Sequence, residues 1–256
     1  MKALIDINAD LGESPEALAS GADFELMHYI TSANVACGGH AGDEGTMRQT
    51  VEAAKKLNVA MGAHPSYPDR ENFGRLESPM APAALESSVR EQIASLVAIA
   101  QRLGVRLIHA KPHGALYHAT NKDREIALAV GRAVKEIDPQ LIMVGQAGAP
   151  ALEIWRGMGL RCAAEAFADR TYERDGTLRK RTLPGALLDT PNRAARQALD
   201  IVLHHRVVAG DGSELPVMAQ TICIHSDTPG AAGIARKVSE ELRAAGVQVR
   251  ALSALC

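Results

Sequence analysis

The chain has 256 residues, of which 46% are hydrophobic and 23% charged, a composition typical of a globular protein with one sizeable core. We expect residues 1–256 to form a single domain. Twenty-eight Lys and Arg residues against 30 Asp and Glu residues give a formal charge of −2, and 3% of the residues are aromatic. This balance argues against nucleic acid as a partner, because both a basic surface and a base-stacking platform are missing.

No segment reaches the roughly 18 uninterrupted apolar residues of a membrane span. The carboxylate of Asp6 interrupts the start of the chain before a signal-peptide core could form. We therefore expect no membrane partner and a cytoplasmic location. The cysteines lie far apart without a CxxC pair, so we expect them to be reduced and mainly structural: Cys37, Cys162, Cys223 and Cys256.

Short β-rich runs alternate with helical stretches along the chain, which predicts βα units around a parallel sheet. Strands are predicted at residues 3–9, 31–37, 59–64, 105–111, 141–145, 161–166 and 219–225, with a short candidate at 247–250. Helices are predicted at residues 43–57, 81–103, 121–137, 149–158, 189–205 and 229–245. Asp43 is a candidate N-cap, and Gly104 and Gly246 follow helical runs as C′ residues.

Seven or eight such units in about 250 residues match the length of a closed (β/α) barrel. The alternative is an open doubly wound sheet, which gathers its polar residues at one switch point. Polar residues follow almost every predicted strand, so we predict an irregular seven-stranded (β/α) barrel. Two long charged connections, 65–80 and 168–188, are expected to be substrate lids in preference to plain surface loops.

The first predicted strand carries Asp6, Asn8 and Asp10 on one face, because side chains alternate along a strand. An EF-hand is excluded, since Leu11 and Ala17 stand where its loop needs Gly and Glu. The alternative is a purely structural role, in which backbone N–H groups and basic side chains hold the buried carboxylates. Three polar residues on a buried face are costly without a use, so we favour a functional site.

Histidines recur where other predicted strands end. His40 follows the glycine-rich segment NVACGG, and His64 ends the third strand. The fourth strand presents His109, Lys111 and His113 on one face. The lysine between them should keep both imidazoles uncharged. The structural alternatives are a capping or packing role for His40 and an ordinary solvated end of the fourth strand.

The sixth strand adds Glu165, and the seventh adds His225 and Asp227. In a closed barrel these strand ends converge on one cavity. Possible anion clamps in the loops are Arg70, Arg75, Arg170 and Arg174, whereas His28, His204 and His205 fall in helices and are expected at the surface. The set favours a small anionic substrate and acid–base hydrolysis at a carbonyl, with or without a divalent metal ion bound by Asp10, His40 and His64. P-loop, GxGxxG, HExxH and GxSxG motifs do not occur in the sequence.

Six segments together resemble the LamB/YcsF family, the A subunits of 5-oxoprolinase: IDINADLGE, SANVACGGHAGD, GAHPSYPD with FGR after it, HAKPHGALY, EAFADRTYERDGTL and CIHSDTP. The resemblance runs from residue 4 to about residue 230. It implies a cytoplasmic β/α barrel akin to the glycoside hydrolase and deacetylase superfamily. It also implies ATP-dependent opening of 5-oxo-L-proline to L-glutamate, together with partner subunits B and C.

For this reaction we expect Asp10 or His64 as the base, Lys111 and His113 as electrophilic stabilisers, and His40 and Asp43 as orienting groups. Arg170 is expected to clamp the substrate anion, and further substrate-binding residues are expected to be Asp6, Asn8, Glu165, His225 and Asp227. Two positions depart from the family pattern. Gly39 stands where an aromatic residue is common and is expected to widen the pocket floor, and Ser226 stands where glycine is usual.

Two rival interpretations stay open. The first is a metal-dependent deacetylase or amidohydrolase that acts alone, suggested by Asp10, His40 and His64. The second is a non-catalytic protein of the complex that binds 5-oxoproline and passes it to its partners.

Overall fold

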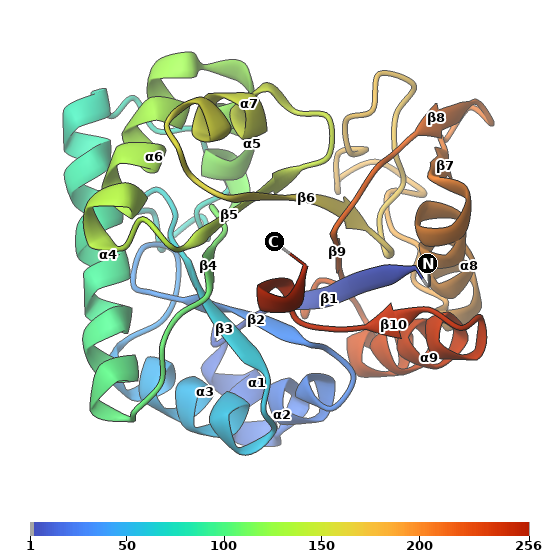
Figure 1. Cartoon of the computed structure of the whole chain (residues 1–256), viewed down its shortest axis with the longest axis horizontal. Coiled ribbons are helices and arrows are strands. Elements are labelled where there is room, and N and C mark those ends of the chain that lie inside the picture. The colour runs from blue at the N-terminus through green and yellow to red at the C-terminus, as the bar shows by residue number, and fades with distance from the viewer. Residues whose placement is uncertain (1–2, 256) are drawn as a thin grey trace.

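Seven parallel strands close into a barrel in the computed structural model, which describes residues 3–255 (Figure 1). Their order around the barrel is β1 (Leu4–Leu11), β2 (Ser32–Ala36), β3 (Ala60–His64), β4 (His109–Ala110), β5 (Ile142–Gln146), β6 (Cys162–Phe167) and β9 (Thr221–Cys223). Pairing of β9 with β1 closes the circle. The predicted irregular seven-stranded barrel is confirmed, and the open sheet is wrong. Strand β4 is the most irregular member, with two residues against the seven predicted.

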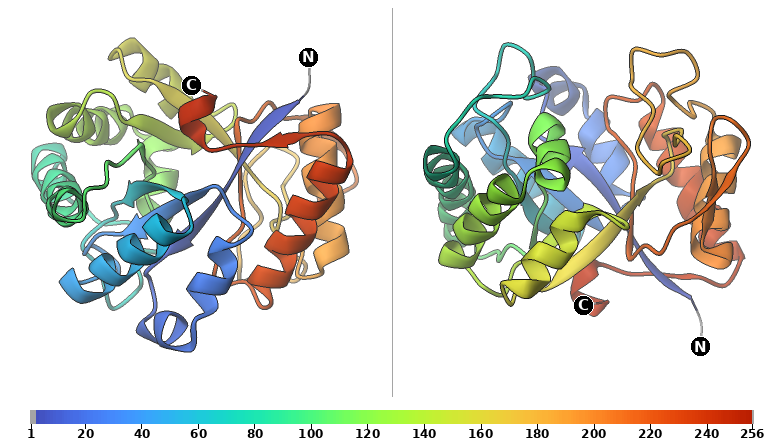
Figure 2. Two further views of the ribbon diagram at one scale, coloured as in Figure 1. Left: turned by 60° about the horizontal axis from the view of Figure 1, so that its bottom comes forward. Right: turned by 90° about the horizontal axis from the view of Figure 1, so that it is seen from above.

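Helices surround the barrel on its outer side (Figure 2). They are α1 (Pro15–Ser20), α2 (Ala22–Met27), α3 (Glu44–Lys56), α4 (Pro82–Arg102), α5 (Gly114–Lys122), α6 (Arg124–Ile137), α7 (Pro150–Gly157), α8 (Pro191–His204) and α9 (Ala231–Ala244). Gly104 and Gly246 have φ angles of 68° and 80° after α4 and α9, as predicted for C′ residues. Within residues 3–255, no helix combines the length and the apolar character that crossing a membrane requires.

Local capping explains where the helix prediction fails. The predicted helix 121–137 is two helices, because Asp123 is extended and its carboxylate accepts hydrogen bonds from the N–H groups of Glu125 and Ile126. That cap ends α5 and starts α6. Helices α1 and α2 were not predicted. Helix α1 begins at Pro15 behind Ser14, whose hydroxyl accepts from the N–H of Ala17.

The C-terminal segment seals the amino end of the barrel. Strand β10 (Gln248–Val249), at the predicted short candidate, pairs with the first residues of β1. The short helix η1 (Leu252–Ala254) follows and lies at the centre of Figure 1. Leu252 packs there against Ile142, Val144 and Ala163 at the starts of β5 and β6. These contacts cover the amino end of the barrel lumen, opposite the carboxyl ends of the strands. A hairpin of β7 (Arg206–Val208) and β8 (Glu214–Pro216) also was not predicted.

Strand β1 divides its side chains between two environments. Ile5, Ile7, Ala9 and Leu11 belong to the apolar core under the helices. The alternate residues Asp6, Asn8 and Asp10 are buried inside the barrel, where their hydrogen bonds join other strands. The predicted alternation of faces along this strand is confirmed.

Gly62 in β3 makes room for a buried histidine. A Cβ atom at this position would overlap the imidazole of His109. That ring is fully buried, and its Nε2 lies 2.7 Å from Oδ1 of Asn34. The ring therefore cannot move without breaking a buried hydrogen bond.

We expect Gly62→Ala to lower the free energy of unfolding by about 1–3 kcal/mol, because it overpacks the barrel interior. Denaturant unfolding would measure the loss. Gly233→Ala is the matched control, because nothing lies within 4 Å of its added methyl group, and it should leave stability unchanged or raise it by up to about 1 kcal/mol. Equal stability of the two variants would contradict this account.

Candidate active site

The barrel interior holds a hydrogen-bonded column of polar side chains, in place of the Val, Ile and Leu layers typical of such barrels. Asn8 donates from Nδ2 to Oε1 of Glu165 at 3.0 Å and to Oγ1 of Thr221 at 2.7 Å. Asn34 donates from Nδ2 to Oδ1 of Asn8 and to Oδ1 of Asp10, both at 2.7 Å. The column thereby ties β1, β2, β6 and β9 together across the lumen.

Asp6 forms the lowest part of this column. Its carboxylate accepts hydrogen bonds from the hydroxyls of Thr31, Ser32 and Thr221 at 2.7, 2.6 and 2.5 Å. Burial raises the pKa of Asp6 to about 6, although the three hydroxyls act in the opposite direction.

Three predicted substrate-binding residues lie below the cavity and outside its lining. Asp6, Asn8 and Glu165 are 0–1% exposed, and none of them lines the cavity described below. Their polar atoms bind one another, neighbouring hydroxyls and Lys111. They support the site from beneath, which is the structural role that the sequence left open.

Lys111 lies at the top of the column between two carboxylates. Its Nζ is 3.0 Å from Oδ1 of Asp10 and 2.9 Å from Oε1 of Glu165, and it also lies 3.2 Å from Sγ of Cys223. Burial alone would lower the pKa of Lys111, but the carboxylates outweigh it and hold that pKa well above its usual value. Lys111 is therefore a fixed cation, suited to stabilise developing negative charge and unsuited to act as a base.

Asp10 is the matching fixed anion. Burial would raise the pKa of this carboxyl group, but His64 and Lys111 lower it well below its usual range. Oδ1 of Asp10 lies 3.4 Å from Nε2 of His64. The strand ends thus place an ionised carboxylate, an ammonium group and an imidazole side by side, as the sequence predicts.

A cavity of about 360 Å³ opens above Lys111 at the carboxyl ends of the strands. Its lining includes Asp10, His64, Lys111, His113 and His225 from the strand ends, Tyr117 and His118 from α5, Phe167 from β6, and Arg75, Arg170, Leu178, Lys180, Arg181 and Thr182 from the two long loops. Both loops predicted as lids contribute to its wall. Five of these side chains are Lys or Arg and one is Asp, so the cavity favours an anionic ligand.

Three histidines and one glutamate gather beside the cavity. The rings of His40 and His113 stack at 3.6 Å between centroids, and His64 stands nearly perpendicular to His113. Oε1 of Glu13 lies 2.9 Å from Nε2 of His40 and 3.2 Å from Nδ1 of His113. Burial lowers the pKa of His40 to about 4 and also lowers that of His113.

This cluster differs from the metal-binding set expected from the sequence. His40 and His64 are present in it, but Glu13 and His113 converge with them in place of Asp10. Glu13 was missed even though it follows β1 directly in the segment NADLGE, and its position after a strand was the available signal.

The rim of the cavity carries paired charges. Asp227 binds Arg75 at 2.5 Å and Arg181 at 2.8 Å, and thereby joins the two long loops. Arg170 is buried and donates to the backbone carbonyls of Arg179 and Ala186, so it shapes the loop in addition to lining the cavity. Arg181 was not among the predicted anion clamps, although it lies in the same loop as Arg170.

His225 is held by a carboxylate that sequence reasoning missed. Its Nδ1 lies 3.0 Å from Oδ1 of Asp169, and its ring stacks on Phe167. Asp169 is fully buried and also accepts from the hydroxyl of Thr228. Because a carboxylate only accepts, Nδ1 carries the hydrogen and Nε2 is available in the cavity.

Asp43 is not part of the site. Its exposed carboxylate caps α3, accepting from the N–H of Thr46 at 2.8 Å in a capping box. The predicted N-cap is confirmed, and the carboxylate predicted to orient the reaction lies outside the cavity lining. Two of the predicted anion clamps also lie elsewhere, since Arg70 donates to the carbonyl of Gly42 and Arg174 is exposed outside the cavity lining.

Gly39 does not widen the cavity floor. A Cβ atom there would overlap the side chains of Gln92 and Ser66. Gln92 donates to the carbonyl of Ser66 and accepts from its N–H, so it fills the space beside Gly39. The expectation for this position is therefore wrong, because a side chain of α4 occupies the room.

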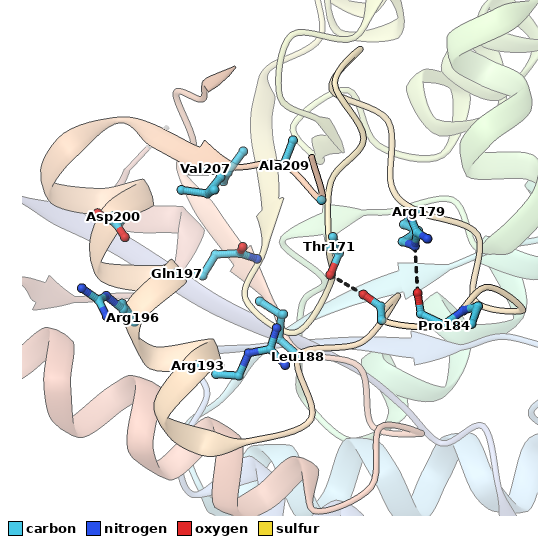
Figure 3. A pocket seen from close by; sticks show the side chains of 13 residues that line it. Thr171, Arg179, Pro184, Leu188, Arg193, Arg196, Gln197, Asp200, Val207 and Ala209 are labelled. Atoms are coloured by element: carbon cyan, nitrogen blue, oxygen red, sulfur yellow. Dashed lines mark hydrogen bonds between the residues drawn. The ribbon is translucent and has the colours of Figure 1, made fainter. Parts of the chain in front are cut away.

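A second cavity, of about 610 Å³, lies between α8 and the 168–188 loop (Figure 3). Its polar side chains form hydrogen bonds with nearby backbone carbonyl groups: Thr171 donates to that of Gly185, and Arg179 donates to that of Pro184. Its lining contains arginines and Asp200 but no histidine, cysteine or lysine. It lacks the acid–base groups of the first cavity, so the smaller cavity is the better candidate.

Fold and site together define a (β/α)-barrel protein with a buried ionic column beneath a cationic cavity. The chain belongs to the LamB/YcsF family, whose model matches residues 5–256. Cys256 lies outside the described residues, while Cys37 and Cys223 are free thiols.

Named relatives cover almost the whole chain. A protein of Chloroflexus aggregans, named as the A subunit of 5-oxoprolinase, is 50% identical over 246 residues, which are 96% of this chain and 98% of the relative. A protein of the same name from Thermus thermophilus is 47% identical over 247 residues, which are 96% and 99% of the two chains. The crystal structure of the lactam utilization protein from Thermus thermophilus superposes with a TM-score of 0.90 at 46% identity, covering 97% of this chain and 99% of that one.

Asp6 should make the stability of the protein depend on pH. Its pKa is about 6 in the folded protein against an ordinary 3.8, so folding favours the protonated form. The stabilising effect is complete below pH 4 and is lost as the pH rises to about 6 and beyond, amounting to roughly 3 kcal/mol. Asp6→Asn should remove this component. Urea unfolding of both proteins at pH 4.5 and pH 7 measures it, and parallel pH dependence of the two would contradict it.

Proposed function

We propose that this chain is the A subunit of an ATP-dependent 5-oxoprolinase, which opens 5-oxo-L-proline to L-glutamate together with subunits B and C in the cytoplasm. One observation carries the proposal: the Lys111–Asp10 pair lies at the base of a cavity whose rim bears arginines. The names of the relatives at 50% and 47% identity agree with it.

The substrate class follows from charge and size. The cavity volume of about 360 Å³ is near the lower end of the roughly 300–1,000 Å³ of small-molecule sites. A small lactam with one carboxylate fits its excess of positive charge. We place the carboxylate at Arg170 and Arg181, because guanidinium groups bind carboxylates in a bidentate manner. The lactam ring then faces Lys111 and Asp10.

The reaction adds water across an amide C–N bond. ATP would phosphorylate the lactam oxygen, which releases ADP and activates the ring carbon. Water then adds to that carbon, the C–N bond breaks as the nitrogen takes up a proton, and a second water hydrolyses the resulting acyl phosphate to glutamate and phosphate. Lys111 stabilises the negative charge that develops on that oxygen. Asp10 positions the water through its ionised carboxylate. His225, oriented by Asp169, is placed to take a proton from the attacking water at Nε2 and to pass it to the leaving nitrogen.

The test is reconstitution of the three proteins of the complex with 5-oxo-L-proline and ATP, following glutamate release. Omission of this chain should abolish release, and Lys111→Met should lower kcat by at least about 100-fold. Lys56→Met, at an exposed position of α3, is the control and should keep full turnover. Circular dichroism checks folding, because Lys111→Met leaves two buried carboxylates without their cation.

Two outcomes would overturn the proposal. Glutamate release that does not need this chain would remove its catalytic role. Amide hydrolysis by the chain alone, without ATP, would instead favour a stand-alone amidohydrolase, the alternative that the histidine cluster supports.

Substitution of one arginine in each cavity tests which cavity binds the substrate. Arg181→Gln should raise KM for 5-oxoproline by about tenfold, equivalent to about 1.4 kcal/mol, because it removes one partner of the substrate carboxylate. Arg196→Gln, in the second cavity (Figure 3), removes the same charge at a distance from the site and should leave KM unchanged. A larger effect of Arg196→Gln would place the substrate in the second cavity and contradict the proposed binding site.

A further inference from the structure

The ring nitrogens of two buried histidines face each other at 3.0 Å, and each ring contacts a backbone carbonyl oxygen through its other nitrogen. Nδ1 of His64 lies 2.7 Å from the carbonyl oxygen of Lys111, and Nε2 of His113 lies 3.0 Å from that of Phe73. Carbonyl oxygens only accept, so these two nitrogens carry the ring hydrogens. In neutral rings, Nε2 of His64 and Nδ1 of His113 then both present lone pairs, at a separation of 3.0 Å. Two lone pairs repel at this distance unless a cation binds both.

A carboxylate oxygen completes a triangle with these two nitrogens. Oε1 of Glu13 lies 3.2 Å from Nδ1 of His113 and 3.7 Å from Nε2 of His64. The three separations of 3.0, 3.2 and 3.7 Å bracket about 3.3 Å, the edge of a tetrahedron whose metal–ligand bonds are about 2.0 Å long. The three side chains are only 1–8% exposed.

Ring orientation separates ligands from supporting groups. The lone pair of an imidazole lies in its ring plane. The planes of His64 and His113 are at 86°, so they can meet at one ion. His40 is stacked on His113 with 4° between the planes, so these two rings cannot both aim at it. His40 instead contacts Glu13 through Nε2 at 2.9 Å and orients the carboxylate.

We propose that His64, His113 and Glu13 bind a divalent transition-metal ion, with His40 and the carbonyl groups of Lys111 and Phe73 as orienting partners. Histidine ligands characteristically donate their second N–H to a carbonyl or carboxylate, as both rings do here. Two imidazoles and one carboxylate suit Zn²⁺ and its first-row neighbours better than Mg²⁺ or Ca²⁺. Both histidines line the cavity, so a ligand there can reach the ion. The inference does not depend on the proposed function.

The test uses Zn²⁺ and Co²⁺ with the full chain after removal of metal by a chelator. Calorimetric titration with Zn²⁺ should give one ion per chain, and Co²⁺ should develop visible d–d absorption bands. His64→Gln and His113→Gln should each weaken Zn²⁺ binding by more than about 100-fold, whereas His40→Gln should weaken it by about tenfold and keep the Co²⁺ spectrum. His204→Gln, at an exposed position at the end of α8 and outside the cavity lining, is the matched control.

Several results would overturn the metal site. One is a folded wild-type chain that takes up neither Zn²⁺ nor Co²⁺, which would mean that a proton bridges the two rings. Another is unchanged affinity in both His64→Gln and His113→Gln, or equal loss in His204→Gln. If the histidine variants do not fold, Glu13→Gln provides the same comparison, with unfolding midpoints measured with and without Zn²⁺.

Discussion

The ammonium group of Lys111 is the interaction on which the rest of this site depends. Asp10 and Glu165 are almost completely removed from water, and each would be strongly destabilising as an unpaired buried anion. Lys111 contacts both and also the amide oxygen of Asn8. The barrel can therefore keep carboxylates in its lumen, where barrels usually keep aliphatic side chains. The same cation then faces the cavity as a preorganised positive charge.

This arrangement explains why the chemistry sits at one end of the molecule. The apolar contact of Leu252 closes the amino end, and the polar column rises from Asp6 to Lys111 at the other end. A buried polar column of this kind is stable only if the polar atoms of each layer find hydrogen-bond partners in the next layer. The serine and threonine hydroxyls around Asp6 and the two asparagines above it supply those hydrogen bonds.

Much of this architecture could be predicted from the sequence, because strand periodicity and strand-end chemistry are local signals. The seven barrel strands and the convergence of Asp10, His64, Lys111 and His113 follow from them. Depth along the barrel axis is not a local signal. Sequence reasoning could not distinguish Asp6, which lies beneath the cavity, from Asp10, which lines it, although both share one face of β1.

Other features depend on contacts between distant segments. Asp169 matters because it meets His225 from another strand, and Gly39 because Gln92 of α4 fills the space beside it. Asp43 shows the opposite case, since a capping residue and a site residue look alike beside a glycine-rich turn. Glu13 was accessible in principle, because it follows the first strand by two residues.

The pairing of Asp227 with Arg75 and Arg181 has a consequence for how the cavity fills. Asp227 already occupies Arg181, one of the two guanidinium groups at which we place the incoming carboxylate. Entry of an anion is therefore an exchange of one carboxylate for another, and the two loops are released from each other as it happens. Binding of the anion and separation of the two loops therefore occur together. A neutral molecule of the same shape has no carboxylate to replace that of Asp227, so it leaves the loops joined.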